Sequence, residues 1–217
     1  MSEQNLTQHS DQAGLETLQD IKRIMERSSR FLSLSGLSGI AAGICALAGA
    51  WFANNKLNPY YDRYDERGGL DKMEFHDLKI SLLLIAAIVL AAALLTSFYF
   101  TWRRAKQNHL PLWDHTSKKL FVNMIIPLAA GGLFILAMLQ NDEWRYIAPS
   151  CLVFYGLALV NASKYTLTDI RYLGLFEIVL GLMNTQFIGY GLYFWAVGFG
   201  VLHIVYGAIM WWKYERS

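Results

Sequence analysis

Six apolar stretches of roughly twenty residues follow one another after residue 30, and this feature limits the possible folds of the chain most strongly. About twenty helical residues, each adding about 1.5 Å, cross a hydrocarbon core of about 30 Å. The sequence therefore predicts an all-α polytopic membrane protein with six transmembrane helices. The expected spans are Phe31–Ala53, Ile80–Phe100, Leu120–Leu139, Tyr146–Ala162, Ile170–Ile188 and Leu192–Trp212.

The charged residues support this interpretation, because they are few and lie between the apolar stretches. They make up 17% of the 217 residues, whereas the surface of a soluble domain needs about a quarter. The net charge of +2 provides no strong field for nucleic-acid binding. Cys45 and Cys151 lie inside apolar stretches, so we interpret them as small apolar residues and not as a disulfide framework.

The chain divides into a polar beginning and a membrane part. Residues 1–30 are expected to form a cytoplasmic tail with an amphipathic helix, because apolar residues recur there at helical spacing among charged ones. Residues 31–217 are expected to form the six-helix transmembrane domain. The amphipathic helix could lie in the headgroup region or pair with a partner helix. The first alternative is favoured because Arg23, Arg27 and Arg30 adjoin the membrane.

Lysine and arginine are distributed unevenly between the two sides of the expected spans. The connections on the side of the N-terminus hold about twice as many as those on the other side. Because positively charged connections stay in the cytoplasm, both termini are predicted to be cytoplasmic. We expect a multi-pass membrane protein.

The longest connection, Asn54–Lys79, is also the most acidic and lies on the outer side in this arrangement. Its acidic residues do not follow the spacing of a calcium-binding loop. We therefore expect a solvated loop with aromatic residues at the membrane interface, and the Gly68–Gly69 pair predicts a turn within it.

Motifs for catalysis or cofactor binding are absent from the sequence. It contains neither an HExxH zinc motif nor a GxxxxGK[ST] phosphate loop. His109 and His115 share a connection without cysteines or paired acids nearby, so they do not make a persuasive metal site. We expect no catalytic residues, no metal and no cofactor.

The first span carries a row of small residues at every fourth position, namely Ser35, Gly39 and Gly43. Such rows let helix backbones approach closely in lipid. The row is expected to pack inside the six-helix bundle, and self-association through the same face is the alternative.

The last two spans place one ionisable residue each deep inside an apolar run. Glu177 and His203 are equally far from Tyr190, which stands at the centre of the expected turn. In an antiparallel hairpin such residues lie level, so we expect Glu177 and His203 to form an intramembrane polar pair. Asn184 and Asn123 could extend the pair into a polar track.

Small residues accompany each member of the expected pair. Gly174 and Gly181 share a helical face with Glu177, and Gly200 and Gly207 share one with His203. We expect these glycines to be helix-packing positions that let the last two helices close around the pair.

Two interpretations of Glu177 and His203 remain open. A lone carboxylate is costly in lipid, so it should be paired, protonated or in contact with water. The pair is either an interhelical polar clasp or a proton-binding or substrate-binding site in a small transporter or sensor.

The segment Met25–Gly39, which reads MERSSRFLSLSGLSG, resembles uncharacterised bacterial six-span inner-membrane proteins. The resemblance implies a six-helix inner-membrane protein and no established activity. We expect a structural or regulatory protein that depends on a partner, with a small proton-coupled transporter or channel as the alternative. Besides the lipid bilayer, the expected partner is another protein, or a second copy held through the first helix or the amphipathic helix.

Overall fold

The computed structural model describes residues 35–67, 72–108 and 113–216, and these form helices without any strand. The all-α prediction is therefore confirmed. The amphipathic helix expected within residues 1–30 lies outside the described residues. In chain order the helices are α2 (Gly36–Arg67), α3 (Lys72–Gln107), α4 (His115–Gln140), η1 (Trp144–Tyr146), α5 (Ile147–Ala162), α6 (Ile170–Gln186), α7 (Gly191–Trp195), the π-helical η2 (Ala196–Leu202) and α8 (His203–Tyr214).

Five helices in the described ranges are long and apolar enough to cross a membrane, so the chain is a multi-pass membrane protein. They are Gly36–Pro59, Phe75–Gln107, His115–Gln140, Trp144–Ala162 and Gly191–Tyr214. The fifth expected span, Ile170–Ile188, corresponds to α6, which has 17 residues and is not among the five. The last expected span is a single rod in which α7, η2 and α8 follow one another.

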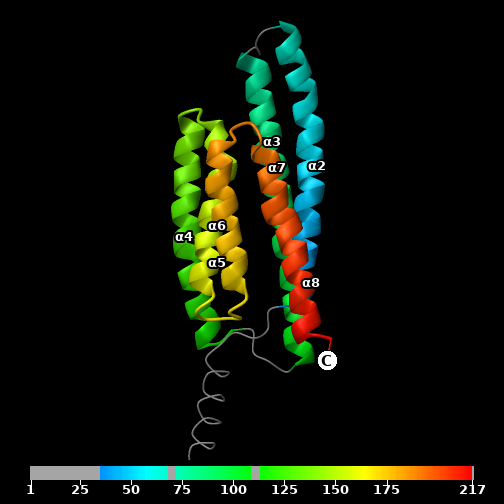
Figure 1. Cartoon of the computed structure of the whole chain (residues 1–217), viewed down its shortest axis with the longest axis vertical. Coiled ribbons are helices and arrows are strands. Elements are labelled where there is room, and N and C mark those ends of the chain that lie inside the picture. The colour runs from blue at the N-terminus through cyan, green and yellow to red at the C-terminus, as the bar shows by residue number, and fades with distance from the viewer. Residues whose placement is uncertain (1–34, 68–71, 109–112, 217) are drawn as a thin grey trace, which may run out of the picture.

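The helices form two groups that lie side by side (Figure 1). In the first half, α2 packs against α3, η2 and α8. In the second half, α5 packs against both α4 and α6. The short helix α7 leads from the second half back to the first and contacts α5.

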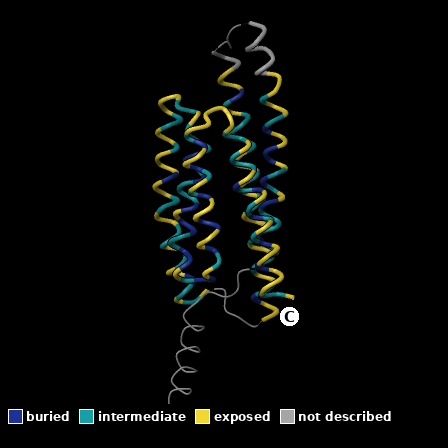
Figure 2. Tube along the Cα trace, viewed as in Figure 1, coloured by how far each residue is buried: buried dark blue, intermediate teal, exposed yellow. Residues whose placement is uncertain are grey.

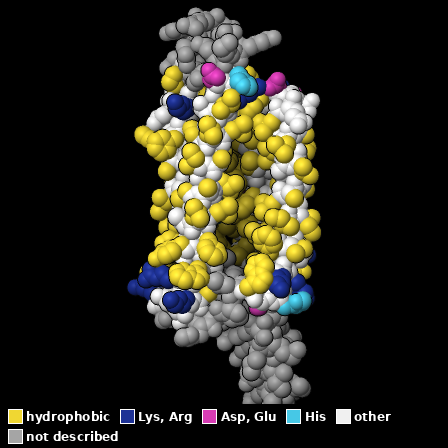
Figure 3. Space-filling model, turned by 180° about the vertical axis from the view of Figure 1, so that it is seen from behind, with side chains coloured by type: hydrophobic (Ala, Val, Ile, Leu, Met, Phe, Trp, Pro, Cys, Tyr) yellow, Lys and Arg dark blue, Asp and Glu magenta, His cyan; other side chains and the backbone are white. Residues whose placement is uncertain are grey.

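The outer surface of both halves is apolar, as expected for helices in lipid. Exposed residues run along the whole length of α4 (Figure 2), and α3 buries almost none of its apolar residues. Figure 3 shows apolar side chains on the flank of the bundle, with a hollow between two columns of helices. Lysine and arginine side chains gather near the lower end in that view.

The prediction of a loop over Asn54–Lys79 is wrong, because most of this segment is helical. The helix α2 continues to Arg67 and α3 begins at Lys72, so the two helices extend beyond the ends of the others (Figure 1). Charged and amide residues continue a helix that is already nucleated at little cost. The turn predicted at Gly68–Gly69 lies outside the described residues.

Glycines decide which helix α6 packs against. A Cβ atom on Gly174 would lie 2.7 Å from the carbonyl oxygen of Gly156 in α5, and one on Gly156 would lie 2.6 Å from the carbonyl oxygen of Gly174. Gly181 likewise faces the carbonyl oxygen of Pro149. The prediction that Gly174 and Gly181 close α6 against the last helix is therefore wrong, since both glycines face α5.

The small residues of α2 pack against the last rod. A Cβ atom on Gly43 would lie 2.6 Å from the carbonyl oxygen of Gly200, and Gly39 lies against Gly207. Gly200 and Gly207 thus join α8 and η2 to α2 instead of to α6. Since the row is covered within the chain, this face of α2 is not free for self-association.

Candidate functional site

The imidazole of His203 joins the two halves near the middle of the spans. Its Nε2 atom lies 2.8 Å from the hydroxyl oxygen of Tyr155, which belongs to α5. Its Nδ1 atom lies 3.0 Å from the carbonyl oxygen of Gly198 in η2. Phe199 stacks on the same ring, with centroids 6.0 Å apart. Both ring nitrogens therefore have partners in a buried position.

These two hydrogen bonds determine where the proton of a neutral His203 lies. The carbonyl oxygen of Gly198 can only accept, so Nδ1 carries the hydrogen and donates it. In this tautomer Nε2 accepts the hydrogen bond from the hydroxyl of Tyr155. The ring is thus oriented by one group from each half.

Glu177 reaches the same ring from α6. Its Oε1 atom lies 3.4 Å from Nδ1 of His203, and its side chain has 0% exposed surface. Because the Nδ1 hydrogen already points to Gly198, the carboxyl group of Glu177 lies close to the imidazole without accepting a hydrogen bond from it. Neither of its oxygens has a hydrogen-bond partner among the described residues. The structure thus brings Glu177 and His203 together, and it leaves the carboxyl group unpartnered.

The π-helical segment η2 provides the surface against which the carboxyl group lies. A Cβ atom on Gly198 would be 2.6 Å from Oε2 of Glu177, so only glycine fits there without displacing the carboxyl group. A π-helix has one extra residue per turn and often occurs at functional sites. Here it positions the carbonyl of Gly198 to meet the side chain of His203.

The expected polar track is not formed. Asn184 is buried two turns further along α6, where its Nδ2 atom donates to the carbonyl oxygen of Phe187 at 3.3 Å. Asn123 lies on α4 and donates to the carbonyl oxygen of Lys119 in its own helix at 2.8 Å. Each amide nitrogen bonds a nearby backbone carbonyl, and Oδ1 of Asn184 has no hydrogen-bond partner among the described residues. Spacing alone could not show these local bonds.

Sequence reasoning missed Tyr155 and Gly198. Tyr155 is a phenol in the middle of an apolar span, and its need for a hydrogen-bond partner in lipid was a usable signal. Gly198 precedes Gly200 by two residues, but nothing in the sequence shows that the helix widens there. The residues around Gly198 are equally compatible with a regular α-helix.

Two further polar contacts join the halves, one at each end of the bundle. At the upper end in Figure 1, Lys79 of α3 binds Asp142, and hydrogen bonds from Lys79 and Trp144 lower the pKa of Asp142. At the lower end Asp169, just before α6, accepts from Lys213 and Tyr214 of α8, each at 2.8 Å.

Partial burial acts to raise the pKa of Asp169, but the hydrogen bonds from Lys213 and Tyr214 outweigh it, and the pKa lies below its usual value of 3.8. Polar contacts therefore join the halves at both ends and in the middle.

In the described part of the chain no group of three His, Cys, Asp or Glu residues could hold a metal ion.

Comparison with known proteins adds no family to this description. No family model matches the chain, and no curated protein and no solved structure matches it either.

Proposed function

We propose that this is a structural or regulatory membrane protein, in which Glu177, His203 and Tyr155 form a polar clasp between the two halves. The observation that carries the proposal is the complete enclosure of Glu177, whose side chain has no exposed surface. A transported proton or substrate needs a route to its binding group, whereas a clasp needs only contact. The bonds of His203 to Tyr155 and Gly198 supply that contact.

We further propose six spans with both termini in the cytoplasm, in the inner membrane of a bacterium. The backbone N–H of Gly36, at the start of α2, donates to the carboxylate of Glu215, just after α8. The first and last membrane helices thus begin and end on one face, which requires an even number of crossings. This contact supports a crossing by α6, and the distribution of lysine and arginine supports the orientation.

The proposed partner is another protein. Residues 1–30 carry the amphipathic pattern that suits a partner helix or the membrane surface. Deletion of residues 1–27 should abolish the ability of the chain to complement a strain that lacks it, with normal amounts still inserted in the membrane. Full complementation by the shortened chain would contradict a regulatory role for this segment.

A specific observation favours a second candidate, a small proton-coupled transporter or channel. Among the described residues neither carboxyl oxygen of Glu177 has a hydrogen-bond partner, and an unpartnered ionisable group in the membrane is a candidate proton site. In this alternative, the contacts of Lys79 with Asp142 and of Lys213 with Asp169 close the two ends of the pathway.

One experiment separates the two candidates. The purified chain is reconstituted in liposomes that contain a pH-sensitive dye, and a pH gradient is imposed with and without a membrane potential. For a clasp, proton flux should equal that of empty liposomes for the wild type and for Glu177→Gln. Flux in the wild type that is lost in Glu177→Gln but kept in Glu143→Gln would establish the transporter. Glu143 is a matched control because its side chain is 42% exposed at one end of the bundle.

A further inference from the structure

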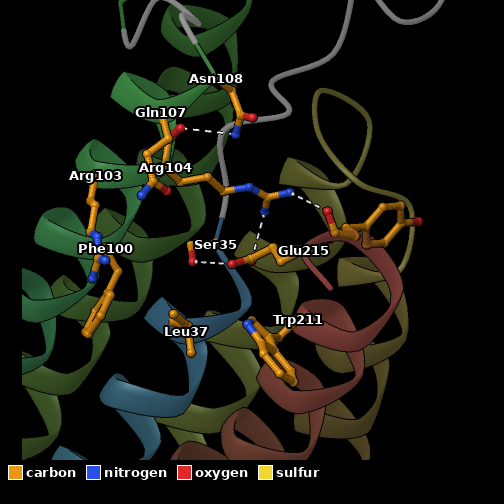
Figure 4. Close-up of a pocket in the computed structure, with 10 residues that line it drawn as sticks. Ser35, Leu37, Phe100, Arg103, Arg104, Gln107, Asn108, Trp211 and Glu215 are labelled. Atoms are coloured by element: carbon orange, nitrogen blue, oxygen red, sulfur yellow. Dashed lines mark hydrogen bonds and ion pairs between the residues drawn. The ribbon is translucent and has the colours of Figure 1, made fainter. Parts of the chain in front are cut away.

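A pocket of about 310 Å³ lies at the C-terminal end of the bundle, where α3 and α8 end and α2 begins (Figure 4). Its lining combines polar residues, including Arg103, Arg104 and Gln107 of α3, with apolar ones, including Leu37 and Trp211. The pocket is separate from the polar clasp, which lies in the middle of the spans.

One side of the pocket is a network around the carboxylate of Glu215. The guanidinium group of Arg104 donates to this carboxylate at 3.0 Å and to the carbonyl oxygen of Tyr214 at 3.3 Å. The hydroxyl of Ser35 donates to the same carboxylate at 3.2 Å (Figure 4). The backbone N–H of Gly36 donates to it as well. The charges of Arg104 and Glu215 offset each other, and the network holds three helices together.

This pairing leaves a surplus of positive charge in the pocket, carried by Arg103. Its side chain is exposed and has no hydrogen-bond or ion-pair partner within the described ranges. Gln107 stands one helical turn further along α3, so its amide and the guanidinium group of Arg103 lie on one helix face. Together they offer donors to one anionic group, and a guanidinium group suits the oxygens of a phosphate.

The position of the pocket in the bundle indicates where that phosphate comes from. Arg103 and Gln107 belong to the last turns of a membrane-spanning helix, and Trp211 belongs to the last turns of another. The ends of such helices lie at the level of the lipid headgroups, where tryptophan is enriched. Leu37, Phe100 and Trp211 add apolar surface beside the polar groups.

We propose that this pocket binds the phosphate headgroup of an anionic phospholipid, with Arg103 and Gln107 as its donors. Basic pockets between membrane helices on the cytoplasmic side commonly hold such headgroups. The apolar side of the pocket accommodates the glycerol and the first methylene groups of the lipid, which a free phosphate does not have. A bound lipid would bridge α2, α3 and α8 and thereby stabilise the first half.

The test measures binding of individual lipids to the purified full-length chain in a neutral detergent, by native mass spectrometry. The probes are phosphatidylglycerol and phosphatidylcholine with the same acyl chains. We expect preferential binding of phosphatidylglycerol and an affinity about fivefold lower in Arg103→Gln, the loss that follows from one basic group near a headgroup. Lys118→Gln is the matched control, since Lys118 is also exposed but lies outside the pocket. It should bind like the wild type.

Three results would overturn the proposal. Equal losses in Arg103→Gln and Lys118→Gln would show diffuse surface charge instead of a site. Equal affinity for phosphatidylcholine would show that the anionic headgroup is not recognised. Displacement of the lipid by inorganic phosphate or glycerol phosphate at similar concentrations would assign the pocket to free anions. Because Arg103 is exposed, the variant should keep the elution profile and helical content of the wild type, and both are recorded.

Discussion

At the scale of single residues, Gly156 and Gly174 determine how closely α5 and α6 approach. Each stands against the backbone carbonyl of the other, so neither position has space for a methyl group. In lipid there is little hydrophobic gain from joining two apolar helices, and close backbone packing replaces it. These glycines therefore stabilise the second half and hold Glu177 at the junction.

We predict that Gly174→Ala destabilises the protein by about 1–3 kcal/mol, because the new methyl group forces the two backbones apart. Thermal unfolding in detergent measures the change. Gly132→Ala is the control, since a Cβ atom there has nothing within 4 Å and alanine favours a helix. Equal stability of the two variants would contradict the close packing.

The hydroxyl of Tyr155 is the second residue whose contribution can be measured. Tyr155→Phe keeps the ring and removes the hydrogen bond to His203, which should cost about 0.6 kcal/mol, the average for such bonds in membrane proteins. Tyr172→Phe should leave the unfolding temperature unchanged, because the Tyr172 side chain is 62% exposed. A Tyr155→Phe variant as stable as wild type would mean that the hydrogen bond between Tyr155 and His203 contributes nothing to stability.

At the scale of helices, the contact between Asp169 and α8 joins the start of α6 to the end of the chain. Lys213 and Tyr214 both donate to one carboxylate oxygen of Asp169. The pKa of Asp169 in the folded protein lies below its usual value of 3.8, so the ionised form is favoured by folding.

This contact should make stability depend on pH in the acid range. A lowered pKa gives a contribution that is complete above the unfolded value of 3.8 and is lost as the pH falls through the folded value. We therefore expect wild type to exceed Asp169→Asn in unfolding temperature at pH 7, with the difference shrinking below about pH 4. Unfolding curves from pH 3 to pH 7 test this, and a difference that is independent of pH would exclude the ionised contact.

At the scale of the whole molecule, the two halves meet through polar contacts in the middle and at both ends, and through apolar contacts such as those of Leu202 and Tyr206 with the cluster that includes Leu159. The proposed six crossings place the turn around Gly189 on the outer face and the end of α8 on the inner face. A reporter enzyme that is active only outside the cytoplasm should be active when fused after Gly189 and silent when fused after Ser217. Silence after Gly189 together with activity after Ser217 would mean that α6 does not cross the membrane while the last rod does.

Several features of this molecule can be predicted from its amino acids alone. Apolar runs of membrane length lead to helices, because a backbone in lipid must satisfy its own hydrogen bonds. The equal distance of Glu177 and His203 from Tyr190 predicted that they lie level, because both helices run from the same turn, and the structure has the two side chains 3.4 Å apart. Such spacing could not show that charged residues would continue α2 to Arg67.

The choice of neighbours for each helix arises only in three dimensions. Gly174 and Gly181 fit against α5 and not against the last rod, because Gly156 and the carbonyl of Pro149 provide the matching surfaces. The partners of His203 likewise come from Tyr155 in another helix and from Gly198 in a widened turn. The local sequence limits which face each helix can bury, whereas the shapes of the other helices determine which faces come into contact. The clasp depends on these contacts between helices.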